Sequence, residues 1–166
     1  MSKAVWTAAA ALAVFTIAVP AIAQSTATAT VNVTVNVSAR ATLDLHGTNS
    51  VTFADADPDT TPSIAAPALT IDVKSRTSAA SNVTLTVVSN QDLTSGSDVI
   101  GIANLTWTST GTGFAAGTMN KTTAQTVGSW TGSGTRSGTV TLKLANSWAY
   151  NAGAYTATLT YTLTAP

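Results

Sequence analysis

The sequence predicts an all-β protein folded as a single antiparallel β-sandwich. Apolar and polar residues alternate with a period of two in many segments, which is the pattern of strands with one buried face. The chain of 166 residues contains 33 Thr and 16 Ser but no Glu. Thr is β-branched and favours extended backbone, and its hydroxyl suits the solvated face of a sheet. Charged residues make up only 8% of the chain, so few charges oppose the pairing of an edge strand with another chain.

Residues 1–23 have the pattern of a cleaved signal peptide. Lys3 precedes an apolar run from Ala4 to Val19, and the small-residue triplet Ala21-Ile-Ala23 follows. The run of about 16 residues is shorter than the roughly 20 that a membrane-spanning helix needs. No later segment is apolar enough to be such a helix. We therefore expect a mature chain that begins at Gln24 and is secreted to the periplasm, the cell surface or the extracellular medium.

The first mature segment, Ala27 to Leu45, alternates strictly, with apolar residues at odd positions and polar residues at even positions. At about 3.3 Å per residue it would be roughly 60 Å long as one strand, about three times a typical strand. Two interpretations stay open. Residues 26–37 and 39–45 are two strands of one domain joined by a bulge. Alternatively, residues 24–38 are an extended N-terminal strand in front of a sandwich domain of residues 39–166.

Shorter strand patterns separated by turn residues follow, which gives about eight or nine strands in total. Residues 132–138 are rich in Gly and Ser, so we expect a hairpin loop there between two strands. The expected strands are residues 51–53, 69–73, 83–87, 105–107, 127–130, 140–144 and 155–163.

The segment Asn151-Ala-Gly-Ala-Tyr155-Thr-Ala157 resembles the tyrosine corner of immunoglobulin-like sandwiches, where a tyrosine hydroxyl bonds to nearby backbone at the start of strand F. The resemblance implies an immunoglobulin-like sandwich that ends with strand F and lacks its last strand. Such a sandwich exposes a groove beside its final strand. We expect the acceptor edge of this groove to be formed by Tyr155, Leu159, Tyr161 and Leu163.

The surplus strand at the N-terminus offers an occupant for that groove. An N-terminal segment inserted into a neighbouring subunit by donor-strand exchange would link subunits head to tail. The inserting side chains would be Val31, Val33, Val35 and Val37. The sequence therefore predicts self-association through strand pairing.

Two groups of bacterial surface proteins share these features. The signal peptide, the small Thr-rich β domain and the terminal pattern of Gly153, Tyr155, Leu159 and Tyr161 resemble chaperone–usher pilins and spore coat U-like proteins. Residues 155–166 are similar to the end of WxL-type cell-wall-binding domains. The chain departs from these families in having no cysteine pair and no Trp-x-Leu motif. The resemblance implies an exported structural or adhesive subunit of a pilus-like or coat-like polymer, with a periplasmic chaperone as partner.

One loop carries a candidate metal site. Asp55, Asp57 and Asp59 alternate along it, a spacing that can bring three oxygen ligands to a calcium ion. The EF-hand pattern is absent, because Thr60 and Ala66 occupy its Gly and Glu positions. The alternative interpretation is a solvated acidic turn.

A second loop carries candidate sugar-binding residues, Trp148 and Tyr150, whose rings can stack on carbohydrate. This loop supports a second functional hypothesis, a monomeric secreted cell-wall- or carbohydrate-binding module with a glycan as partner. Trp107 and Trp130 lie in strand patterns and are expected in the core.

Composition argues against several other functions. The formal net charge is zero, and seven Lys and Arg residues cannot build the basic face that nucleic acid requires. The chain has no cysteine, and His46 is its one histidine. No G-x-S-x-G nucleophile motif occurs. We therefore expect no enzymatic activity, no catalytic residues and no cofactor other than calcium.

Overall fold

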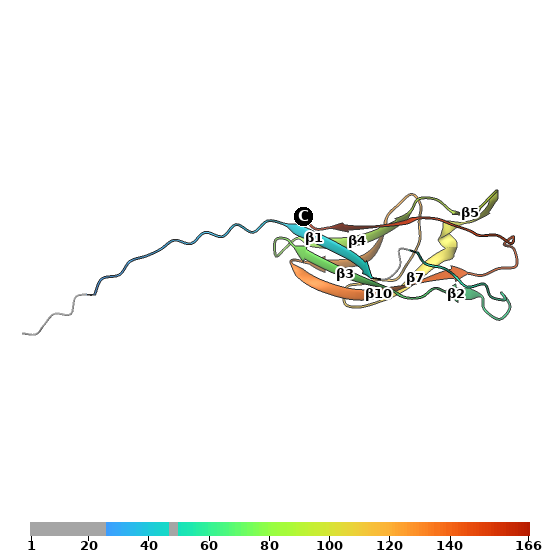
Figure 1. The fold of residues 1–166 in the computed structure, drawn as a ribbon, viewed down its shortest axis with the longest axis horizontal. Helices are drawn as coiled ribbons and strands as arrows, with labels where there is room; N and C mark the ends of the chain where they lie inside the picture. Colours follow the sequence, from blue (N-terminus) through green and yellow to red (C-terminus); the bar gives the residue numbers. More distant parts are fainter. Residues whose placement is uncertain (1–25, 47–49) are drawn as a thin grey trace, which may run out of the picture. The chain divides into compact units, whose positions relative to one another are not determined.

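The structure, a computed structural model, describes residues 26–46 and 50–166. Residues 36–166 form one compact unit. Its antiparallel strands form two main sheets that pack around one hydrophobic core, which confirms the predicted all-β sandwich. Figure 1 shows the two layers of this unit. The expected signal peptide lies outside the described residues.

The larger sheet, sheet A, has the strand order β1-β3-β10-β7-β8, and the short strand β2 also pairs with β10. The long strand β10 joins the two ends of the domain, because its first residues pair with the end of β3 and its last residues pair with β2. The strands of sheet A are β1 (Arg40–His46), β2 (Ser63–Ala65), β3 (Leu69–Arg76), β7 (Leu105–Thr110), β8 (Gly117–Thr118) and β10 (Gly134–Ala145).

The smaller sheet, sheet B, has the order β11-β4-β9. The pairing of β4 with β9 shifts register after Leu85, which marks a bulge. A separate hairpin, β5–β6, precedes a 3-10 turn at Ile102–Asn104. The strands of sheet B and of the hairpin are β4 (Asn82–Ser89), β9 (Gln125–Thr131), β11 (Leu159–Thr164), β5 (Leu93–Ser95) and β6 (Asp98–Ile100).

The core consists of inward-facing side chains from both sheets. In β4, Val83, Leu85 and Val87 are fully buried, and the residues between them are only partly covered. Ile71 and Val73 of β3 are equally well buried. Because successive strand residues point to opposite faces, this burial follows the period of two seen in the sequence. Each fully buried side chain of this size contributes about 1.5–3 kcal/mol to folding.

The outward-facing positions of sheet B carry threonines in register. Thr162 of β11 lies opposite Thr86 of β4, which in turn lies opposite Thr126 of β9. Thr164 faces Thr84 in the same way. The outer face of this sheet is therefore built from rows of hydroxyl and methyl groups.

Trp107 and Trp130 pack into the core, as their strand positions predict. Both indole N–H groups have partners: Trp107 donates to the Ala115 carbonyl over 2.8 Å, and Trp130 donates to the Thr112 carbonyl over 2.7 Å. Trp130 also meets Phe114 edge to face, with ring centroids 5.0 Å apart. Buried indoles pack well only when the N–H group is satisfied in this way.

The predicted hairpin loop at residues 132–138 is wrong. β9 and β10 belong to different sheets, and only Gly132 and Ser133 connect them. Gly132 makes this sharp crossing with a φ of 71°, a conformation that glycine adopts without steric cost. The glycines that favoured a loop instead lie within β10, where Gly138 pairs with Ile71 of β3.

The predicted strand at residues 51–53 does not form. Val51 and Phe53 are nevertheless partly buried against the core, so their alternation reflects packing beside a sheet rather than pairing within it. Of the long alternating N-terminal segment, only β1 is a strand, and residues 26–39 belong to none. The interpretation that residues 26–37 form a strand of the same domain is therefore wrong.

Gly128 provides a test of the packing around Trp130, because a Cβ atom at this position would overlap the indole ring. We expect Gly128→Ala to lower the free energy of unfolding by about 1–3 kcal/mol, since the ring or the strand must move. Gly101→Ala is the matched control, because its Cβ would lie 3.6 Å from the nearest atom. Urea unfolding followed by tryptophan fluorescence measures both variants, and equal stabilities would contradict this packing.

Candidate functional site

One side of the sandwich is open at a groove between the end of β1, with residues 50–53 after it, and the segment that leads into β11. β1 is an edge strand of sheet A, β11 is an edge strand of sheet B, and the two lie beside each other without pairing (Figure 1). The groove has a volume of about 460 Å³. Its lining residues are Leu45, Ser50, Val51, Phe53, Leu69, Leu93, Leu105, Leu142, residues 155–159 and Tyr161.

The inward-facing side chains beside the groove are only partly covered. Leu159, Tyr161 and Leu163 of β11 are half-buried, whereas the neighbouring β4 buries its inward-facing residues completely. In sheet A, Leu43 and Leu45 of β1 are half-buried beside the well-buried β3. The core is therefore closed along β3 and β4 and open between their outer neighbours.

The chemistry of the groove suits an extended peptide. None of its lining residues carries a charge, and its most deeply buried members are Leu93, Leu105 and Leu142. β11 pairs with β4 on one side only, so its other edge offers backbone groups to a further strand. Apolar pockets beside a free strand edge are the two features that strand addition uses.

The predicted last strand, residues 155–163, is confirmed for its second half. β11 begins at Leu159, and the alternation of half-buried and exposed residues extends back to Tyr155. Ahead of β11, Thr156 forms an isolated bridge with Thr94, whose N–H group donates to the Thr156 carbonyl over 3.1 Å. The segment is thus held in an extended form before its regular pairing begins.

The hydrogen bond that the tyrosine-corner resemblance implies is present. The Tyr155 hydroxyl donates to the Asn151 carbonyl over 2.9 Å. The Asn151 side-chain amide in turn donates to Asp98 over 2.8 Å. These bonds fix the start of the segment that lines the groove. Desolvation and the nearby Asp98 carboxylate raise the pKa of Tyr155.

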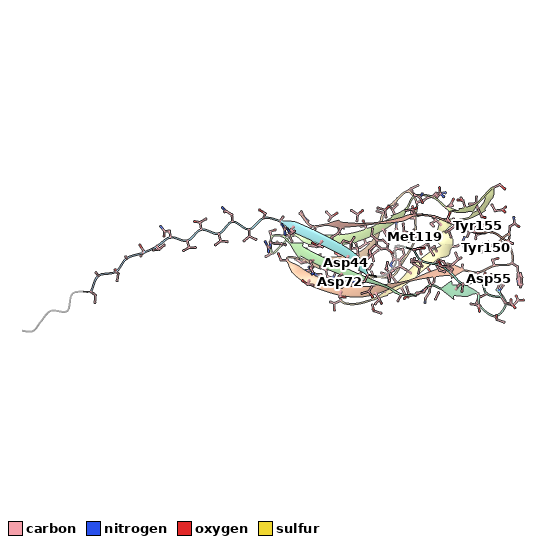
Figure 2. All side chains as sticks on the ribbon, viewed as in Figure 1. Asp44, Asp55, Asp72, Met119, Tyr150 and Tyr155 are labelled. Atoms are coloured by element: carbon pink, nitrogen blue, oxygen red, sulfur yellow. The ribbon has the colours of Figure 1, made fainter. Side chains whose placement is uncertain are left out.

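A polar cluster lies on the outer face of sheet A, outside the groove. Asp44 of β1 and Asp72 of β3 face each other in register, and His46 Nε2 lies 2.7 Å from Asp72 and 3.6 Å from Asp44. Figure 2 shows the two aspartates side by side. Hydrogen bonds from Ser137 and His46 lower the pKa of Asp72. The sequence did not reveal this cluster, because Asp72 reaches His46 only through the register of β1 with β3.

The structure does not bring Asp55, Asp57 and Asp59 together as a metal site. The Asp57 carboxylate accepts the Asp59 N–H group over 2.9 Å, which closes a local turn. Asp59 accepts the indole N–H group of Trp148 over 3.0 Å. In the part of the chain that the structure describes, no group of three acidic or histidine side chains converges as metal ligands would.

The two candidate sugar-binding residues differ in exposure. Trp148 is 70% exposed, whereas Tyr150 is half-buried and packs against the core. Trp148 is thus a single exposed ring, placed beside Asp59 by its N–H bond. The proposed donor residues, Val31, Val33, Val35 and Val37, are 65–86% exposed and belong to no strand.

Comparisons with protein-family models and with curated proteins gave no match for this chain. Across residues 26–46 and 50–166, no helix has the length and apolar character needed to cross a membrane. The functional argument therefore rests on the groove and on the charges and exposed side chains of the domain.

Tyr161 reports on the groove through its ionisation. Burial raises the pKa of its phenol to about 12, so the unfolded chain loses this proton first as the pH rises above about 10. The folded state then binds more protons than the unfolded state, and stability falls with rising pH. We expect Tyr161→Phe to lose less stability than the unmodified protein between about pH 9 and pH 11. Parallel urea titrations that show identical losses would contradict this burial.

Proposed function

We propose that this protein is an exported structural subunit whose groove between β1 and β11 accepts an extended strand from a second copy of the chain. The observation that carries the proposal is a mismatch within one molecule. The inward-facing residues beside the groove are only partly covered, and an alternating apolar segment of the same chain is exposed. Strand insertion would cover both surfaces at once.

The proposed donor matches the groove in chemistry and spacing. Alternate residues of a strand lie about 6.6 Å apart and point to one face. Val31, Val33, Val35 and Val37 would therefore reach the apolar side of the groove over roughly 20 Å. The intervening Asn32, Thr34 and Asn36 would face solvent. Backbone groups of the donor would pair with the free edge of β11.

Insertion into a second copy is favoured over insertion into the same chain. A donor segment that folded back beside its own β1 would have to reverse direction within Ser38 and Ala39. Tight hairpin turns of two residues need positive φ angles, which Gly, Asn and Asp provide and these residues do not. A donor from another copy needs no such turn.

An exported surface location and a chaperone partner belong to the same proposal. The N-terminal segment, residues 1–23, has the features of a signal peptide. A subunit with an open apolar groove is prone to aggregate before assembly. A periplasmic chaperone that covers the groove until a donor strand arrives would prevent this. The assembled product would be a pilus-like or coat-like polymer with a structural or adhesive role.

Paired substitutions in the donor segment test the proposal. We expect Val33→Asp with Val35→Asp to abolish polymers, because two carboxylates would be buried in an uncharged groove. Thr34→Asp with Asn36→Asp is the matched control, since it adds the same charges on the solvent-facing side. Light scattering with size analysis, and electron microscopy of the exported chain at rising concentration, follow assembly. Equal assembly by the two variants, or no assembly by the unmodified chain, would contradict the proposal.

The exposed Trp148 favours one alternative function, a monomeric carbohydrate-binding module. A single exposed indole can stack on a sugar ring. For this alternative we expect Trp148→Ala to lower glycan binding by about tenfold, roughly 1.4 kcal/mol. Trp107 is buried in the core and takes no part in the site. A glycan array compares the variant with the unmodified protein. Equal glycan binding by the two proteins, or no glycan binding by either, would exclude this alternative.

A further inference from the structure

Most charged side chains of the domain lie near its two ends, and Asp44 and Asp72 lie on the outer face of sheet A. Six Lys and Arg residues lie in the described part of the chain, and four of them surround the point where β1 begins and β3 ends. We call this the basic end, formed by Arg40, Lys74, Arg76 and Arg136. The opposite end, where β10 finishes, carries four of the seven aspartates. We call it the acidic end, formed by Asp55, Asp57, Asp59 and Asp98.

Strand register fixes the basic end. Arg40, the first residue of β1, lies directly opposite Arg76, the last residue of β3. Two like charges facing each other across a strand pair are unfavourable within the domain. Neither arginine forms an ion pair with a described residue, and both are exposed, as is Lys74. Arg136 points inward instead and donates to Ser75 over 2.9 Å. Arg40 and Arg76 are therefore left for a partner, whereas Lys74 also interacts with Asp72.

Side-chain hydrogen bonds fix the acidic end. Asn146, directly after β10, donates to the carbonyls of Ala56 and Thr61 over 2.9 and 3.1 Å, which anchors the loop that carries Asp55, Asp57 and Asp59. In Figure 2, Asp55 and Tyr150 are both labelled at this end of the domain. Asp98 joins it through its bond with Asn151. One cation, Lys143 near the end of β10, is close by.

The two ends are too far apart to neutralise each other. β10 runs from one to the other and has 12 residues, which corresponds to roughly 40 Å. Charges in physiological salt are screened over about 8 Å. Each end therefore presents its own charge to the surroundings, although the chain as a whole is neutral.

The acidic end also has the right chemistry to hold arginine. Trp148 is 70% exposed there, and its N–H group is bonded to Asp59. A guanidinium group stacks on an indole face and pairs with a carboxylate at the same time, and Arg and Trp are typical anchors of protein interfaces. The surface that matches an exposed pair of arginines is thus present on the same molecule.

We infer that copies of this chain dock end to end, with the basic end of one domain on the acidic end of the next. The inference rests on the proposed self-assembly and adds the contact between domains that gives it direction. The opposite ends attract, whereas contacts between like ends repel, so only one order of subunits is favoured.

This docking also sets the direction of the inserted strand. The donor segment is joined to its own domain at Arg40, at the basic end. Because this end docks on the acidic end of the next copy, the last residues of the donor segment would lie at the acidic end of the accepting copy. β11 runs toward the basic end, because the Pro166 carbonyl next to its end accepts a bond from Thr77, just after β3. A donor placed by this contact would therefore run antiparallel to β11, the direction that gives perpendicular hydrogen bonds.

Charge reversal tests the contact in the exported chain. One variant carries Arg40→Glu, Lys74→Glu and Arg76→Glu, which leaves three negative charges and one positive charge at the basic end, so that both ends are acidic. The other carries Asp55→Lys with Asp59→Lys, which together with Lys143 leaves three positive and two negative charges at the acidic end, so that both ends are basic, and keeps the turn-forming Asp57 in place. We expect each variant alone to assemble at least about tenfold more slowly than the unmodified protein at low salt. Mixed in equal amounts, the two should recover assembly, because acidic ends then meet basic ends.

Three controls make the result specific. All five substitutions in one chain should restore assembly, because the attraction is then reversed but intact. Thr108→Glu with Thr126→Glu adds charge to the outer faces of β7 and β9 and should change the rate by less than about twofold, away from both ends. Assembly of the unmodified protein should slow as salt rises. Thermal unfolding of every variant separates loss of docking from loss of folding.

The outcomes separate this inference from the proposed function. If the charge-reversed variants assemble like the unmodified protein while Val33→Asp with Val35→Asp does not, end-to-end docking is overturned and strand insertion stands. If folded charge-reversed variants fail alone and also fail when mixed, docking is overturned. Salt-sensitive pairing of ends that persists in Val33→Asp with Val35→Asp supports docking and counts against strand insertion. An unmodified protein that stays monomeric at low salt overturns both.

Discussion

The structure depends on two sheets of unequal width covering each other. Neighbouring strands lie about 4.8 Å apart, so three strands of sheet B span about 10 Å between their outer axes, and the five-strand path of sheet A spans about 19 Å. Side chains on the inner face of the wider sheet gain their full transfer free energy only where something lies over them. On the β7 and β8 side, Phe114 bridges to Gly128 of sheet B, and Trp130 packs against it. On the β1 side, no strand among the described residues fills the difference, and the groove results.

The groove exists because sheet B is too narrow to cover the inner face of sheet A, and not because of any particular residue. Leu159 and Tyr161 resemble the inward-facing residues of β4 in character, and they differ only in lacking a neighbour on one side. A surface of this kind recognises shape, alternation and a free strand edge. Its specificity for a particular strand must therefore come from elsewhere. Contacts between domains at the ends of the sandwich can supply it, since charge patterns select partners more sharply than apolar burial does.

The period of two was enough to predict the sheet architecture and several strands, including β3, β4 and the inward-facing residues of β11. It failed where pairing depends on distant partners. Residues 51–53 alternate like a strand but lie beside the sheet, and the glycines of 132–138 favour a loop although sheet pairing holds them in β10. The shortest strands, such as β8, contain too few residues for any period. The cluster around His46 and the segregation of charge arise only when register places residues far apart in sequence at one position.

The threonine rows of sheet B have a consequence for where such a protein can work. A face of hydroxyl and methyl groups has no group that titrates in the range of carboxylates and imidazoles, so changes of pH in that range leave its charge at zero. The positions at which this surface binds water follow from the sheet geometry, because neighbouring hydroxyl groups repeat at the spacing of the strands. Exported proteins meet surroundings that no cell buffers. A coat built from such faces would keep these faces uncharged, while its charged ends and the cluster around His46 would respond to the pH of the medium.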